Sequence, residues 1–261
     1  MSEMIKQKKC IVSFSGGAGS FVSAERAIDK YGKENTILVF CDTSIEDEDL
    51  YRFVRESIEK LGCANVILKD GRTPWDVFRE KRYQGNTRTA HCTTELKGKV
   101  FKAWLNANYY QYECILVFGF DWSEQHRHET AKKNYEGWEC WSPLLDPPYL
   151  YKQDLFEIIE GYGMKIPRLY RFGFSHNNCG GFCVKAGQEH FFRLLTLLPD
   201  VYAHHEKEQE KLMKEIPTTR PFLRKVENGK IKYLTLKQFR ESVESGERHD
   251  ELDFGGCGCF V

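Results

Sequence analysis

The sequence predicts an α/β fold, with a doubly wound, mostly parallel sheet and a cysteine-rich cap at its C-terminal end. Three observations predict it. Short apolar segments alternate with helical segments up to residue 118, a glycine-rich turn follows the first apolar segment, and cysteines gather near residues 179–183 and 257–259. Alternating strands and helices are typical of a parallel sheet that carries helices on both faces.

The apolar and amphipathic patterns predict the elements in order. We expect strands over 10–14, 36–41, 65–68 and 114–118, and helices over 21–31, 48–61 and 94–106. In 48–61 the apolar residues recur at helical spacing, which puts them on one face. After a turn-rich connector at 142–148, we expect helices over 154–162, 190–197, 202–215 and 236–244, and a strand over 230–236.

The domain organisation follows from these segments. Residues 1–150 form a nucleotide-binding-like core, and residues 151–261 form a helical, cysteine-rich part packed on it. Because no linker, repeat or low-complexity tract divides the chain, we expect one compact unit.

Charge and cysteine content exclude several protein classes. The 261 residues hold 38 Lys and Arg and 38 Asp and Glu, a net charge of 38 − 38 = 0, which excludes a polycation and an acidic tail. No apolar run reaches the roughly 18 residues of a membrane span, and no signal peptide opens the chain. We expect a cytoplasmic protein, in which ten cysteines indicate metal, cluster or catalysis more than disulfides.

The turn Ser15-Gly-Gly-Ala-Gly-Ser20 stands between a predicted strand and a predicted helix. Backbone N–H groups and the positive end of a helix meet at such a turn and can hold an anion. We therefore expect a phosphate of a nucleotide to bind at Ser13, Ser15, Gly16, Gly17, Ala18, Gly19 and Ser20. A tight turn without a ligand is the alternative, because short glycine motifs also occur by chance.

The turn resembles the Ser-Gly-Gly-x-Asp-Ser loop of the PP-loop superfamily, and later segments resemble its PAPS-reductase-like branch in the same order. These segments include Phe40-Cys-Asp-Thr-Ser-Ile-Glu46, His91-Cys-Thr-Thr-Glu-Leu-Lys97, Gly119-Phe-Asp-Trp-Ser-Glu124 and Cys179-Gly-Gly-Phe-Cys183. The resemblance runs from about Lys9 to Gly187. It implies an adenine-nucleotide α-hydrolase-like core that binds ATP or PAPS, with Lys97 and Arg127 at the phosphates.

Two departures from the family pattern change what this core is expected to do. Gly19 stands where the loop has Asp, and Asp121 stands where the branch has its first Arg. An anion in place of a cation repels a triphosphate by about 1–4 kcal/mol at close range. A phosphate site is still expected, whereas ATP chemistry is disfavoured without being excluded.

Cysteines supply a candidate metal site. Cys179 with Cys183, and Cys257 with Cys259, form two close thiolate pairs, and the resemblance adds Cys92. Four or five thiolates suit zinc or an iron–sulfur cluster. Two alternatives remain: ordinary packed thiols, or a nucleophilic Cys257 or Cys259 like the C-terminal cysteine of sulfonucleotide reductases.

Carboxylates follow two of the predicted strands. Asp42 follows the strand 36–41, and Asp121 and Glu124 follow the strand 114–118. Ligands of open α/β sheets bind at this edge, so each of these carboxylates is a candidate general base. Aromatic residues in nearby loops could stack on an extruded base.

Three functions fit these features. The first is hydrolytic removal of a modified or unmodified base from DNA, a DNA glycosylase activity, in defence against phages. The second is an ATP- or PAPS-using sulfur transferase or reductase with a cysteine-bound cluster. The third is a nucleotide sensor without catalysis. The expected partner is accordingly DNA or a nucleotide, and no membrane.

Overall fold

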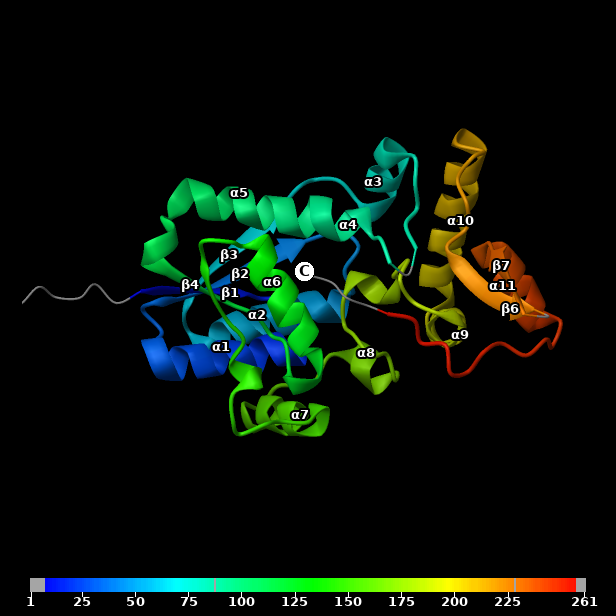
Figure 1. Ribbon diagram of the computed structural model, residues 1–261. Coiled ribbons are helices and arrows are strands. Elements are labelled where there is room, and N and C mark those ends of the chain that lie inside the picture. Colours follow the sequence, from blue (N-terminus) through cyan, green and yellow to red (C-terminus); the bar gives the residue numbers. More distant parts are fainter. Residues whose placement is uncertain (1–7, 87, 228, 257–261) are drawn as a thin grey trace, which may run out of the picture.

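The computed structural model describes residues 8–86, 88–227 and 229–256, and its centre is a five-stranded parallel sheet (Figure 1). The strands are β1 (Lys9–Ser13), β2 (Thr36–Asp42), β3 (Ala64–Lys69), β4 (Cys114–Val117) and β5 (Glu139–Trp141). They lie in the order β3-β2-β1-β4-β5, and every neighbouring pair is parallel. The predicted fold class is therefore confirmed.

Helices cover both faces of this sheet. One face packs against α1 (Ala18–Tyr31), α2 (Glu48–Leu61) and α7 (Lys152–Gly161), and the other against α5 (Lys99–Asn108) and α6 (Gln125–Asn134). On β1, Cys10 and Val12 join the first hydrophobic cluster and Ile11 joins the second, which is the two-residue period of a strand. Cys10 is fully buried and burial raises the pKa of its thiol to about 12, so this cysteine is a packing residue.

The strand order reverses beside β1, and this reversal positions the site. The chain passes from β1 outward to β2 and β3, and then returns to β4 on the other edge of β1. The turns that leave β1 and β4 therefore meet at the carboxyl edge of the sheet. Ligands of open α/β sheets bind at such a switch point.

The second half of the chain builds a third hydrophobic cluster beside the sheet (Figure 1). It joins α3 (Pro74–Lys81) to α9 (Gln188–Leu197), α10 (Pro199–Glu215), α11 (Leu236–Glu244) and the antiparallel pair β6 (Leu223–Glu227) and β7 (Lys230–Leu234). The indole Nε1 of Trp75 on α3 donates to His205 Nδ1 on α10 at 3.0 Å. Conversely, Tyr162 beside α7 donates to Glu25 on α1 at 2.8 Å.

The boundary predicted near residue 150 therefore does not separate the packing of the two parts. Helix α3, which precedes it, packs with the second part, and α7, which follows it, packs with the first. Short elements complete the path: α4 (His91–Thr93), a π-helical turn η1 (Thr94–Gly98), α8 (Arg168–Arg171), and 3₁₀ turns η2 (Gln111–Glu113), η3 (Trp122–Glu124), η4 (Pro143–Leu145) and η5 (Cys179–Gly181). The helix predicted over 94–106 begins with this π turn. Within the described ranges, no helix is both long and apolar enough to cross a membrane.

Candidate functional site

The glycine-rich turn joins β1 to α1. Gly16 has φ +74°, and a Cβ there would lie 3.0 Å from Val54 Cγ2 on α2, so the turn needs glycine at this position. Gly17 is the N-cap of α1 and offers no side-chain oxygen to the first amides of the helix. The helix therefore begins with N–H groups and a positive dipole end that an anion can satisfy.

Gly19 and Gly119 bring the start of α1 against the turn after β4. A Cβ on Gly19 would lie 2.7 Å from the carbonyl oxygen of Gly119, and a Cβ on Gly119 would lie 2.7 Å from the Ser20 amide nitrogen. Backbone touches backbone here, so neither position has room for a side chain. This contact is a structural reason for glycine at position 19, where the resembled loop carries Asp.

Residues from the second half of the chain hold the turn from outside. The Ala18 amide donates to the Tyr170 hydroxyl at 3.3 Å, and the Asn177 side-chain amide donates to the Gly16 carbonyl at 3.1 Å. Ser20 Oγ donates back to the Gly17 carbonyl at 2.8 Å. The loop is thus fixed before any ligand arrives, although one of its amides already has a hydroxyl partner.

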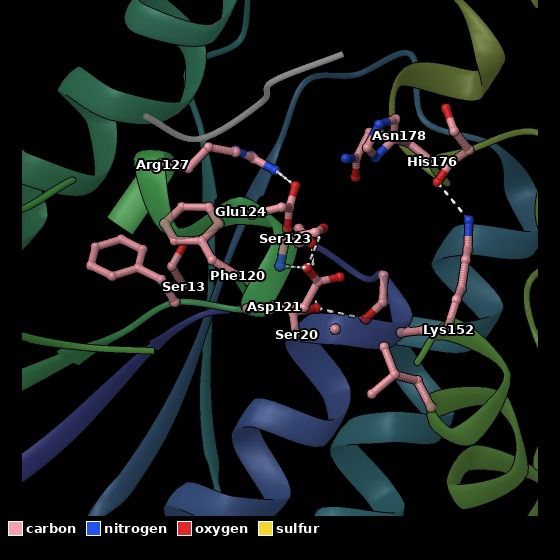
Figure 2. Close-up of a pocket in the computed structure, with 18 of the residues that line it drawn as sticks. Ser13, Ser20, Phe120, Asp121, Ser123, Glu124, Arg127, Lys152, His176 and Asn178 are labelled. Carbon is pink, nitrogen blue, oxygen red and sulfur yellow. Dashed lines mark hydrogen bonds and ion pairs between the residues drawn. The ribbon is translucent and has the colours of Figure 1, made fainter. Parts of the chain in front are cut away.

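A cleft of about 280 Å³ opens in front of this turn (Figure 2). The turn and the residues after β4 form one side, and residues beside α7 and α8 form the other. Its lining comprises Ser13, Ser15, Gly17, Ala18, Gly19, Ser20, Phe118, Gly119, Phe120, Asp121, Ser123, Glu124, Arg127, Lys152, Leu155, Tyr170, Ser175, His176 and Asn178. The cleft therefore contains most of the predicted phosphate-binding residues.

Two cations line the cleft from opposite sides. Arg127 on α6 pairs with Glu124 and lies over the Phe120 ring at 4.6 Å. Lys152 at the start of α7 donates to the Ser175 carbonyl at 2.8 Å. Loss of hydration lowers the pKa of Lys152, and the charges of Asp121 and Glu124 act in the opposite direction.

The carboxylate of Asp121 lines the same cleft. It is the N-cap of η3, where Oδ1 accepts from the Ser123 amide at 2.8 Å and from Ser123 Oγ at 2.6 Å. Within the described residues, Oδ2 accepts no hydrogen bond. Asp121 is therefore held in place by one oxygen and keeps the other for a ligand or a water molecule, as Figure 2 allows the reader to follow.

Asp42 is placed differently from Asp121 and Glu124. It ends β2 as predicted, but it does not line the cleft. Its Oδ1 accepts from the Tyr51 hydroxyl at 2.7 Å and from the Ser44 amide at 2.8 Å, and its Oδ2 lies 3.3 Å from Lys69 Nζ. This network covers the carboxyl end of β2 and gives Asp42 a structural role.

Lys97 also lies outside the cleft lining, as does Gly16. The Lys97 ammonium is buried 3.6 Å from Glu46 Oε1, and Glu46 in turn accepts from the Thr43 hydroxyl and the Cys179 amide. A buried ion pair of this kind leaves little freedom to either charge. It ties the end of β2 to the loop that carries Cys179.

Three of the five cysteines of the predicted metal site lie within the described residues. Cys179 is buried with φ +55°, and Cys92 and Cys183 pack at the edge of the third hydrophobic cluster. Across the described ranges, no three His, Cys, Asp or Glu side chains are close enough together to hold a metal ion. Cys257 and Cys259 lie outside the described residues, so the predicted four-thiolate site remains a prediction.

Several cleft residues are absent from the sequence prediction. Lys152, Ser175 and Asn178 come from the second half of the chain, beyond the predicted strands, and fold back over the turn. No motif marks Lys152, which stands in the first turn of an ordinary amphipathic helix. The packing of α7 against α1 brings it to the cleft.

Comparisons with known proteins add two similar solved structures. No family model and no curated protein matches the chain. A phosphate complex of phosphoadenylyl-sulfate (PAPS) reductase from Candida auris is 14% identical, with a TM-score of 0.46, and the match covers 67% of this chain and 82% of that one. A predicted tRNA methyltransferase subunit from Methanocaldococcus jannaschii is 18% identical, with a TM-score of 0.34 and coverage of 61% and 90%. At these values the likeness says nothing about substrate or reaction.

Proposed function

We propose that the chain is an enzyme that holds a phosphate of DNA at the start of α1 and hydrolyses the bond between a base and its sugar. One observation carries the proposal. The glycine-rich turn at the start of α1, the cations Arg127 and Lys152, and the carboxylate of Asp121 all line one cleft. Such a cleft suits a ligand that joins a phosphate to an uncharged reacting centre.

In this proposal, the amides and the cation bind the phosphate, and the carboxylate takes part in the reaction. The amides of Gly17, Gly19 and Ser20 and the Lys152 ammonium bind the phosphate and fix the sugar beside it. Asp121 Oδ2 accepts a proton from water as the oxygen of that water bonds to the sugar carbon. The bond from this carbon to the base breaks, and the base leaves with the bonding electrons and takes up a proton from solvent. Asp121 then releases its proton to solvent. No nucleotide triphosphate enters this reaction, in keeping with the lack of room for an Asp side chain at Gly19.

The reaction is tested by abasic-site formation. Purified protein is incubated with modified and unmodified phage DNA, and abasic sites are counted with an aldehyde-reactive probe. Asp121→Asn keeps the N-cap oxygen and should fold, but it removes the base, so we expect product formation to fall at least about 100-fold.

Asp154→Asn is the matched control. Asp154 Oδ2 accepts a hydrogen bond from the Tyr151 amide at 2.6 Å at the start of α7, and Asp154 does not line the cleft. We expect its activity to equal that of the wild type. If the wild type makes no abasic sites on any of these DNAs, base removal is not the reaction.

A second candidate function is sulfur transfer or reduction with ATP or PAPS. It is supported by one observation, which is that Asn178 lines the cleft and the next residue is Cys179. A thiol loop would then stand directly beside the nucleotide. This function requires ATP or PAPS to bind, so isothermal titration with each nucleotide separates it from the first, which requires neither.

A further inference from the structure

A second hollow borders the cleft. It measures about 470 Å³ and is lined by Trp122, Gln125, Leu145, Tyr149 and Tyr151, which we call the aromatic groove. The three aromatic side chains remain 45%, 60% and 67% exposed. Exposed aromatic surface gathered in one hollow marks a binding site more often than scattered apolar residues do.

Two residues of the aromatic groove are direct chain neighbours of cleft residues. Trp122 stands between Asp121 and Ser123, and Tyr151 directly precedes Lys152. These three neighbours line the cleft. Because adjacent Cα atoms are about 3.8 Å apart, a ligand whose phosphate occupies the cleft reaches the groove with its next unit.

Hydrogen bonds keep the groove in shape without a ligand. The Trp122 indole N–H donates to the Leu150 carbonyl at 3.1 Å, and the Trp122 and Tyr151 rings meet edge to face at 5.5 Å. Arg26 on α1 donates to the carbonyls of Pro143, Asp146 and Pro148 at 2.8, 3.0 and 2.7 Å, which fixes the segment that bears Leu145 and Tyr149. A preformed surface loses little side-chain entropy on binding.

The chemistry of the groove fits a nucleobase. None of its described lining residues is charged, so the groove does not offer a second phosphate site. Its rings offer faces for stacking, which contributes about 1–3 kcal/mol per base. The Gln125 amide makes no hydrogen bond to the described residues and can pair with a base edge through its donors and its acceptor.

We infer that the aromatic groove binds a base of single-stranded DNA, the neighbour of the nucleotide whose phosphate occupies the cleft. The inference rests on the proposed function, since the cleft must first hold that phosphate. The three aromatic residues of the groove are exposed to solvent, so a strand can lie against them. The protein therefore contacts at least two consecutive nucleotides of one strand.

Binding of a labelled DNA strand tests this inference. Fluorescence anisotropy with a single-stranded DNA of about 12 nucleotides should show Trp122→Ala and Tyr149→Ala binding about 5- to 100-fold more weakly than wild type. Trp122→Phe keeps a stacking ring and should stay within about threefold. A strand with abasic sites should bind wild type as weakly as Trp122→Ala binds the intact strand, and should bind Trp122→Ala with no further loss.

The matched control is Tyr112→Ala. Tyr112 is 74% exposed and stacks on Tyr110 at 5.8 Å, but the pair precedes β4 and so lies at the opposite end of that strand from the cleft. We expect it to bind DNA like wild type. If Trp122→Ala loses its circular dichroism signal, Tyr149→Ala and Tyr149→Phe decide the question, with only the alanine variant weakened.

The outcomes separate the groove from the cleft. If the groove variants bind the strand like wild type while Arg127→Gln and Lys152→Gln bind it weakly, the inference fails and the proposed function stands. If wild type binds neither the strand nor inorganic phosphate, the proposed function itself fails. If dAMP binds as tightly as the strand, and Trp122→Ala weakens both equally, the groove serves a free nucleotide and the inference of a strand is overturned.

Discussion

Gly19 shows how a single residue fixes the geometry of the cleft. Its Cα faces the Gly119 carbonyl, which a Cβ would approach to 2.7 Å, and the neighbour is backbone that cannot rotate away. We expect Gly19→Ala to lower the free energy of unfolding by about 1–3 kcal/mol, as overpacking does, and Gly19→Asp to lower it further. Urea denaturation followed by circular dichroism measures both.

Gly161 provides the control for this prediction. It ends α7 with no atom within 4 Å of an added Cβ and no positive φ. Gly161→Ala should leave stability unchanged or raise it by up to about 1 kcal/mol. Equal stability of Gly19→Ala and wild type would mean that α1 does not pack on the turn after β4 as described.

Lys152 gives the cleft a pH dependence. Partial burial lowers the pKa of Lys152 below that of an ordinary lysine. As pH rises, Lys152 therefore loses its positive charge before an exposed lysine does. We therefore expect the affinity for inorganic phosphate to fall between pH 8 and pH 10, where the phosphate charge changes little. Lys152→Gln should bind about 10- to 100-fold more weakly at pH 8 and lose this dependence, as titration calorimetry would show. An unchanged pH dependence in Lys152→Gln would exclude Lys152 as its source.

At the scale of elements, the sequence predicts what local pattern determines. The strands 10–14, 36–41 and 114–118 and the turn at 15–20 follow from runs of apolar residues and from glycine, and β1, β2 and β4 confirm them. It does not predict the three-residue β5 or the position of α3. Trp75 packs on His205, and nothing within α3 encodes that distant partner.

The candidate site divides along the same line. Asp121 and Gly19 lie at the cleft because each follows closely after a strand that its local sequence predicts. Lys152 lies there because α7 packs against α1, which the sequence around Lys152 does not predict. Asp42 stands at the correct edge of the sheet, but Tyr51 from α2 and Lys69 from β3 occupy its carboxylate. Topology could be inferred from the sequence; the partners of a side chain at the sheet edge could not.

The cysteine loop leads to a prediction about metal. The last described residue, Gly256, donates its amide to the Lys185 carbonyl at 2.9 Å, and Ala186 pairs with Gly255, so the described part of the chain ends beside the segment that follows Cys183. We expect purified protein to contain about one equivalent of zinc, or an iron–sulfur cluster that absorbs visible light. Elemental analysis should show the content reduced in Cys183→Ser and Cys257→Ser.

Cys114→Ser is the control for the metal measurement. Cys114 is fully buried in β4, on the face of the sheet that packs against α5 and α6, and burial raises the pKa of its thiol to about 11. It should retain the metal content of wild type. Anaerobically purified wild-type protein without zinc, iron or a visible chromophore would leave the cysteines as packing residues.

The stability of the whole molecule depends on two buried histidines. His205 lies at the contact between α3 and the second half of the chain, and His190 lies within that half. His205 accepts the indole N–H of Trp75 and stacks on Phe182 at 4.0 Å, and His190 Nε2 lies 2.6 Å from the Gly181 carbonyl. Burial lowers the pKa of His205 to about 3 and that of His190 to about 4. Both rings are therefore neutral in the folded protein at pH 5, whereas they are mostly protonated in the unfolded chain.

Acid should accordingly lower the stability of the folded protein through these two histidines. Because the unfolded state binds more protons below pH 6.5, the free energy of unfolding falls as pH drops from 7 to 5, by about 2 kcal/mol for each histidine. His205→Gln keeps an acceptor for Trp75 and cannot be protonated, so urea denaturation at both pH values should show about half of this fall. The exposed neighbour His204→Gln should behave like wild type, and an equal fall in all three proteins would trace the acid sensitivity to other groups.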